Sequence, residues 1–206
     1  SSPHYGKLLL SSSGLPQGTS ENEKIGDQQA DCLVGWNNTF SYKNWAFSFQ
    51  IDGRFGGDIF SSTNQALQKT GRAGVTDNRE EFVVEGVISD GQGGYIENTQ
   101  KVSAQDYWTA VSGGNTGINE ANIYSATNIR LRNIALNYSF PKSMLSKTPF
   151  QQVKLGVSVN NVWMIYSDMN GIDPESVFVT TSNATGLENG SAPTSRSYLF
   201  NVTLGF

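Results

Sequence analysis

The chain has 206 residues and a formal net charge of −4 at pH 7, with 16% charged residues, 11% aromatic residues and 22 glycines. This length suits one domain of moderate size, and low charge with many glycines and aromatics favours an all-β protein with one apolar face. The acidic balance argues against a nucleic-acid partner, the single cysteine Cys32 excludes an internal disulfide, and no apolar run approaches the roughly 18 residues of a transmembrane helix.

Two strands joined by the short turn Lys43-Asn44 are predicted between residues 32 and 55. Large apolar side chains alternate with polar or small ones, which gives each strand one apolar face. Asp52 and Arg54 fall on the polar face of the second strand. The apolar positions are Val34, Trp36, Phe40, Tyr42, Trp45, Phe47, Phe49, Ile51 and Phe55.

Residues 56–128 form a long connection that is polar and rich in glycine. Within it, Glu81 to Ser89 is predicted to form a local strand and Ser103 to Val111 a helical turn, with Ser103 as its N-cap. Three aromatic residues of this connection are candidates for contact with a sugar ligand or a protein partner. They are Tyr95, Tyr107 and Trp108. Such residues also pack within their own loop, and the sequence does not decide between the two.

Three further strands are predicted at residues 129–140, 152–163 and 196–206. In the first, Arg130 and Arg132 fall in the apolar phase of the alternation, which indicates either a β-bulge or a position beyond the apolar band. The last strand is expected to turn one face toward lipid and the other toward a polar lumen. Its lipid-facing positions are Tyr198, Phe200, Val202, Leu204 and Phe206, and its lumen positions are Ser197, Asn201 and Thr203.

Short and long connections alternate along the chain. The turn at Lys43-Asn44 and the connection 141–151 are short, whereas 56–128 and 165–195 are long. This alternation is typical of outer-membrane barrels, with the short turns on the periplasmic side. Five or six strands cannot close such a barrel, which needs at least about eight. We therefore expect residues 1–206 to be the C-terminal strands of a large antiparallel transmembrane β-barrel with long extracellular loops, and its last strand to have a free edge. Asp52 and Arg54 would face the lumen.

Several motifs along the chain resemble the C-terminal barrel of SusC/RagA-type TonB-dependent transporters. They follow the family's order and cover nearly everything from about residue 25 onward. The motifs are Gly35-Trp36-Asn37-Asn38-Thr39-Phe40-Ser41-Tyr42-Lys43-Asn44, Asp52-Gly53-Arg54-Phe55-Gly56-Gly57-Asp58, Arg130-Leu131-Arg132-Asn133-Ile134, Tyr138-Ser139-Phe140-Pro141, Asn160-Asn161-Val162-Trp163, Gly171-Ile172-Asp173-Pro174-Glu175 and the closing Phe206. Trp163-Met164 departs conservatively from the family's Leu-Phe, and the sequence lacks the plug, the TonB-contacting segment and the N-terminal strands.

The resemblance implies a part in TonB-powered import of a nutrient across the outer membrane. It implies a parent barrel of about 22 strands and the lipid bilayer as surroundings, with the C-terminus at the periplasmic side. It also implies a SusD-like surface lipoprotein as partner, contact with TonB through the missing plug, and an oligosaccharide or peptide as ligand, so that glycan uptake is one expected role.

No catalytic residue, metal or cofactor is expected. The one histidine, His4, lies in an N-terminal stretch without strand or helix signals, so a Ser-His-Asp arrangement has no base. Four oxygen-bearing residues crowd one segment, Asp168, Asn170, Asp173 and Glu175, but they lack the full calcium-loop pattern, and Pro174 favours a turn.

The alternative hypothesis is a secreted β-sandwich, such as a carbohydrate-binding module. It explains the alternating strands equally well, but it requires a second sheet that covers their apolar faces.

Overall fold

The computed structural model describes residues 4–169, 171–177, 181 and 183–206. These residues fall into two compact units. The loop unit comprises Ser1–Asp27, Ile59–Tyr124 and Phe178–Gly190, and the sheet unit comprises Gln28–Asp58, Ser125–Val177 and Ser191–Phe206.

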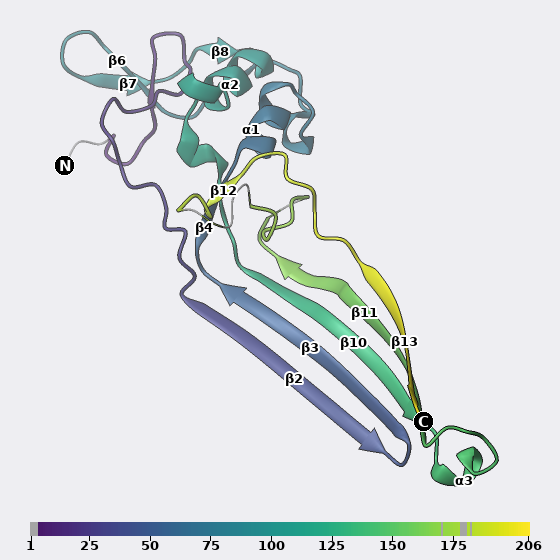
Figure 1. The fold of residues 1–206 in the computed structure, drawn as a ribbon. Helices are drawn as coiled ribbons and strands as arrows, with labels where there is room; N and C mark the ends of the chain where they lie inside the picture. The colour runs from purple at the N-terminus through teal and green to yellow at the C-terminus, as the bar shows by residue number, and fades with distance from the viewer. Residues whose placement is uncertain (1–3, 170, 178–180, 182) are drawn as a thin grey trace. The chain divides into compact units, whose positions relative to one another are not determined.

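A five-stranded antiparallel sheet makes up most of the sheet unit, in the order β13-β11-β10-β3-β2 (Figure 1). Each predicted strand is present, although β11 continues four residues beyond Trp163. The bounds are β2 Cys32–Tyr42, β3 Trp45–Phe55, β10 Asn128–Ser139, β11 Gln152–Ser167 and β13 Ser197–Gly205. The turn between β2 and β3 is the predicted one, and Lys43 within it has a positive φ of 51°.

Backbone register turns the separate alternations into one continuous apolar face. A single row across the sheet joins Phe40, Phe47, Leu136, Val157 and Phe200. Many side chains of this face stay exposed, including Phe40 at 57% and Phe200 at 78%. Within the described part of the sheet unit, no second sheet covers it.

A β-bulge at Arg132 explains the arginines that broke the alternation. Leu131 pairs with Ile51 and Asn133 with Gln50, so Arg132 is an extra residue in the ladder. The bulge shifts the phase of β10 by one, because each face repeats every two residues. Arg130, opposite Asp52, therefore lies on the polar face of the sheet, and the bulge alternative is confirmed.

The short connections meet at one end of the sheet. Figure 1 shows the β2–β3 turn, the β10–β11 connection with helix α3 (Lys142–Leu145), and the C-terminus together there. The two outer strands, β13 and β2, each have one neighbour in the sheet. The described residues thus leave the other edge of β13 free, as predicted.

The long connection does not form an extended loop: together with residues of the N-terminal stretch and residues 183–190 it folds into the loop unit. Its helices are α1 Ser62–Lys69 and α2 Ala104–Val111, with 3₁₀ turns at Gly74–Thr76, Gly114–Thr116 and Asn119–Asn122. Short strands complete it: β1 Leu9–Leu10, β4 Asp58–Ser61, β5 Phe82–Val83, β6 Val87–Ser89, β7 Tyr95–Glu97, β8 Lys101–Val102, β9 Ile123–Ser125 and β12 Leu187–Glu188. The all-β expectation is therefore incomplete in this region. None of the helices described in the structure is long and apolar enough to cross a membrane.

The predicted elements of the loop unit are present in modified form. Ser103 caps α2 by accepting the Asp106 amide at 3.1 Å. The strand predicted at residues 81–89 is two strands, because β5 pairs with β8 whereas β6 pairs with β1 and β7. Between them Val84 packs with Leu10 and Val102 in a small core.

Candidate functional site

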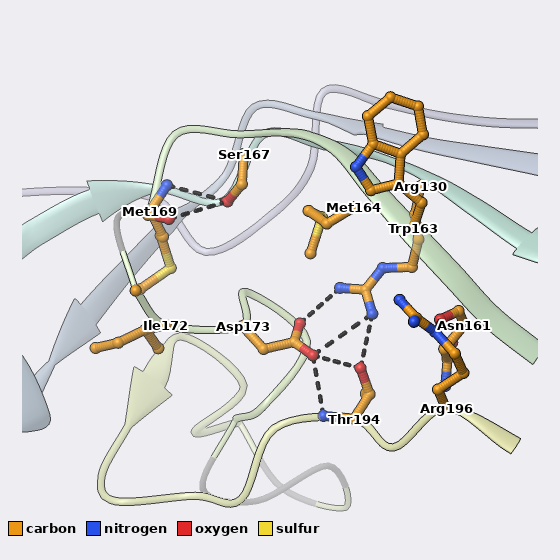
Figure 2. A pocket seen from close by; sticks show the side chains of 11 residues that line it. Arg130, Asn161, Trp163, Met164, Ser167, Met169, Ile172, Asp173, Thr194 and Arg196 are labelled. Atoms are coloured by element: carbon orange, nitrogen blue, oxygen red, sulfur yellow. Dashed lines mark hydrogen bonds and ion pairs between the residues drawn. The ribbon is translucent and has the colours of Figure 1, made fainter.

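Two arginines of β10 bind acidic residues of the segment that follows β11. The Arg130 side chain is buried, and its Nη2 lies 2.6 Å from Oδ1 of Asp173. Its Nη1 donates to Thr194 Oγ1 at 2.8 Å. Figure 2 shows Arg130, Asp173 and Thr194 converging. Because both charged partners are removed from water, this ion pair depends on its geometry and on the additional hydrogen bonds.

Arg132, the bulged residue, links the sheet to the same segment. Its Nε donates to Asp52 Oδ2 at 2.7 Å, and its Nη1 donates to Glu175 Oε2 at 2.8 Å. Nη2 binds the other oxygen of Glu175, so this contact is bidentate. Gln50 also donates to Asp52, at 2.8 Å. The bulge thus aims one guanidinium at two carboxylates.

Further hydrogen bonds join the two ends of the segment 171–196. Thr194 donates its amide to Asp173 Oδ2 at 3.0 Å. Ser176 Oγ donates to the carbonyl of Ala192 at 2.9 Å. Asn161 of β11 donates to the carbonyl of Ser195 at 2.7 Å. The ends therefore hold each other and the sheet.

A pocket of about 360 Å³ lies at this cluster, within the sheet unit. Its lining includes Arg130, Met164, Ile172, Asp173 and Arg196 (Figure 2). Nε of Arg130 is buried without a hydrogen-bond partner among the described residues. The pocket thus combines apolar side chains with two guanidinium groups, which are hydrogen-bond donors to polar oxygen atoms.

Asp173 gives this cluster a pH dependence. Its burial favours the neutral acid, but the hydrogen bonds from Arg130 and Thr194 outweigh burial and hold the pKa of Asp173 below its usual range. A depressed pKa stabilises the folded state above the unfolded value of about 3.9, and this stability is lost as pH falls toward the folded pKa.

We therefore expect the segment 171–177 to stay fixed from pH 8 down through the usual carboxyl range and to loosen only at more acid pH, as the folded pKa of Asp173 is approached. A spin label at Ile172→Cys, in a Cys32→Ser background, reports this as increased mobility. In the matched variant Asp173→Asn, the label at position 172 should be mobile at every pH. A label in the parent background that is already as mobile at pH 5 as in Asp173→Asn would contradict the prediction.

The structure places only one of the two predicted lumen residues in this cluster. Asp52 belongs to it, through Arg132. Arg54 instead donates to the carbonyl of Gln28 at 2.8 Å. Sequence reasoning did not identify Arg130 and Arg132 as members of a site, although their disturbance of the alternation was the signal.

The three aromatic candidates lie in the loop unit and do not form one cluster. Tyr107 and Trp108 are neighbours on α2 with ring centroids 5.1 Å apart. Tyr107 also packs edge-on against Phe82 at 5.2 Å and joins the small core of that unit. Tyr95 is half exposed on a separate strand, β7. Packing within the loop therefore accounts for Tyr107, and ligand contact by Tyr95 and Trp108 stays a prediction.

The oxygen-rich segment is used for ion pairing. Asp173 and Glu175 bind the two arginines, Asp168 accepts a hydrogen bond from the hydroxyl of Tyr166, and Asn170 lies outside the described residues. Among the residues that the structure describes, no group of three or more His, Cys, Asp or Glu is placed to hold a metal ion.

Comparison with known sequences finds TonB-dependent receptors. No family model matches the chain. TonB-dependent receptor P3 of Formosa agariphila is 25% identical over 193 residues, which are 91% of this chain and 18% of the receptor. TonB-dependent receptor P39 of the same organism is 27% identical over 152 residues, 73% of this chain and 14% of the receptor. The chain thus spans less than a fifth of the length of these relatives.

Comparison with solved structures shows the same fold. The RagAB peptide importer in its closed-closed state matches with a TM-score of 0.59 and 13% identity, over 93% of this chain and 19% of the matched chain. The open-open state of the RagAB peptide importer matches with a TM-score of 0.52 and 15% identity, over 84% of this chain and 17% of the matched chain. The antiparallel sheet and its connections therefore correspond to part of a much larger protein.

Proposed function

We propose that this chain is part of a SusC/RagA-type receptor and that its sheet forms one section of the wall of an outer-membrane transport barrel, because the chain is similar to TonB-dependent receptors over most of its length and shares its fold with part of the RagAB importer. TonB-dependent receptors are transport proteins, not enzymes, so the proposed role of the chain is structural and selective rather than catalytic. The main observation behind the proposal is that the continuous apolar face of the sheet is exposed.

That face has the features of a membrane-spanning wall. Five neighbouring strands of 9 to 16 residues present apolar side chains on the same side. The opposite side carries polar rows such as Asn37, Gln50, Asn133, Asn160 and Ser197. Transmembrane barrel strands need about 9–11 residues and alternate in this way.

The β-sandwich alternative requires a partner sheet over the apolar face. The described part of the sheet unit contains one sheet, and Trp36, Tyr198 and Phe200 on its apolar side are all more than half exposed. An exposed apolar surface of this kind is unfavourable in a soluble monomer. The observation therefore favours the barrel wall over a secreted carbohydrate-binding module.

The wider role of the parent receptor follows from the family. We propose import of a nutrient that is an oligosaccharide or a peptide, with a SusD-like lipoprotein at the extracellular mouth and TonB acting through a plug outside residues 1–206. The RagAB match supports the peptide and the two-component arrangement. In the proposed barrel, the short connections and the C-terminus are on the periplasmic side, and the long connections 56–128 and 165–195 are extracellular loops.

The solubility of the isolated chain tests the proposal directly. We expect the purified chain to require detergent, or to aggregate without it, because the apolar face has no cover. Size-exclusion chromatography with light scattering, in buffer with and without a mild detergent, measures this. A monodisperse monomer in plain buffer would overturn the membrane assignment and favour the soluble module.

A further inference from the structure

The segment after β11 folds back over the polar face of the sheet. Strand β11 ends at Ser167, and eight residues later Glu175 contacts Arg132. Arg132 also donates to the side chain of Asn161, six residues before the end of β11, at 3.3 Å. Arg132 lies four residues inside the start of β10, so at about 3.3 Å per residue the contact is roughly 13 Å in from that end of the sheet, a distance that the two long side chains span in part. The chain therefore does not leave the sheet at the strand end.

The side on which the segment returns is fixed by its contacts. Asp52 and Arg130 are paired on the polar face of the ladder. Asp173 binds Arg130, and Glu175 shares the Arg132 guanidinium with Asp52. The returning segment consequently lies against the polar face, opposite the face that carries Phe47, Leu136 and Phe200.

Three ion pairs hold the segment there, one of them between Arg130 Nη1 and Glu175 Oε2 at 3.5 Å. Arg130 is 3% exposed and forms a buried pair with Asp173, while Arg132 holds Glu175 by both oxygens. Thr194, which precedes β13, hydrogen-bonds both Asp173 and Arg130, so it joins residues 171–177 to the residues that lead into β13. The carboxylates of Asp52, Asp173 and Glu175 and the guanidinium groups of Arg130 and Arg132 therefore form one cluster. A hairpin loop does not require such a cluster to connect two strands.

We propose that residues 171–177 form a strap that stands inside the barrel lumen, clamped to the wall by Arg130 and Arg132, and that it narrows the passage beside β10 and β11. The inference rests on the proposed function, because the polar face is the lumen only if the sheet is part of a barrel wall. Which solutes can pass along this section of the wall then depends on whether the clamp holds the strap in place. Met164, which lies opposite Arg130 on the polar face, lines the same pocket as the strap residues Gly171, Ile172 and Asp173.

Labelling of single cysteines in the full-length receptor in intact outer membranes tests the strap. In a Cys32→Ser background, a water-soluble, membrane-impermeant maleimide is applied to receptors that carry Met164→Cys, Asn201→Cys or Phe200→Cys. The clamp is opened on the loop side by Asp173→Ala with Glu175→Ala, which leaves every strand residue of the sheet intact. We expect the opened clamp to accelerate labelling at position 164 by about tenfold or more, because access there requires the strap to move.

The other two positions serve as matched controls. Asn201 is on the polar face outside the strap contacts, so its labelling rate should not change when the clamp is opened. Phe200 is on the apolar face and should stay unlabelled in the membrane in both backgrounds. An unchanged rate at 164, with Phe200 protected, overturns the strap and leaves the barrel wall intact. Rapid labelling at 200 overturns the barrel wall itself.

Discussion

Replacement of Arg130 by alanine is expected to lower the free energy of unfolding by about 3–5 kcal/mol. The substitution removes the partner of Asp173, whose side chain is only 9% exposed, and leaves a buried carboxylate without a counter-charge. It also removes the donor to Thr194 Oγ1. Denaturant unfolding of the receptor in detergent micelles, followed by tryptophan fluorescence, measures the loss.

Two matched variants separate the ion pair from general damage to β10 and β11. Lys154 is an exposed residue of β11, so Lys154→Ala should change the free energy of unfolding by no more than about 0.5 kcal/mol. The double variant Arg130→Met with Asp173→Leu should recover most of the loss, because apolar replacement of both partners removes the unpaired charge. If Arg130→Ala is as stable as Lys154→Ala, the buried pair contributes little and the strap is held by other contacts.

The strands were predictable because each carries its own alternation. The pattern is local, and the turn at Lys43-Asn44 and the proline at 141 mark boundaries that do not depend on the rest of the chain. The bulge was visible as a phase error at Arg130 and Arg132, since one extra residue moves every later side chain to the other face. The sequence left two explanations for that error, and only the pairing of Leu131 and Asn133 with β3 distinguishes them.

The clamp was not predictable from alternation. Arg130 and Asp173 are 43 residues apart in the chain, and a period-2 pattern assigns a residue to a face without naming its partner. The acidic residues of the segment suggested a turn or a weak calcium loop, because oxygen ligands and salt-bridge partners are the same residue types. The separate motifs around Arg130 and Asp173 supported the resemblance, but their mutual contact needed the fold.

The loop unit was the least predictable part, because polar contacts rather than an apolar pattern organise it. Helix α1 has a polar sequence, and its buried Gln68 accepts a hydrogen bond from Ser112, at 2.6 Å. Asn122 donates to the same serine hydroxyl. The hydrogen bonds of these buried polar groups are made with partners that are distant in the sequence. Such groups therefore leave no periodic pattern in the local sequence. The same limit applies to Tyr107, whose place in the core follows from Phe82 and Val84.

An arginine introduced into β13 should destabilise the protein to a very different degree on the two faces of the strand. In the membrane, Phe200→Arg is expected to cost about 2–4 kcal/mol, because the position lies near the middle of the strand and a guanidinium there meets hydrocarbon. Asn201→Arg places the same side chain one residue along, on the polar face, and should cost less than about 1 kcal/mol. Folding of the two receptor variants into lipid vesicles, measured by denaturant titration, gives both values.

The comparison also separates the two hypotheses for the whole chain. In a soluble module, Phe200→Arg removes an exposed aromatic residue that is 78% accessible and should improve solubility without loss of stability. In a barrel wall the same change is the more damaging of the pair. The sign of the difference between Phe200→Arg and Asn201→Arg therefore depends on whether lipid or water meets this face. Equal costs at the two positions would be incompatible with a wall that has one lipid face and one lumen face, because neighbouring residues of a strand point to opposite sides.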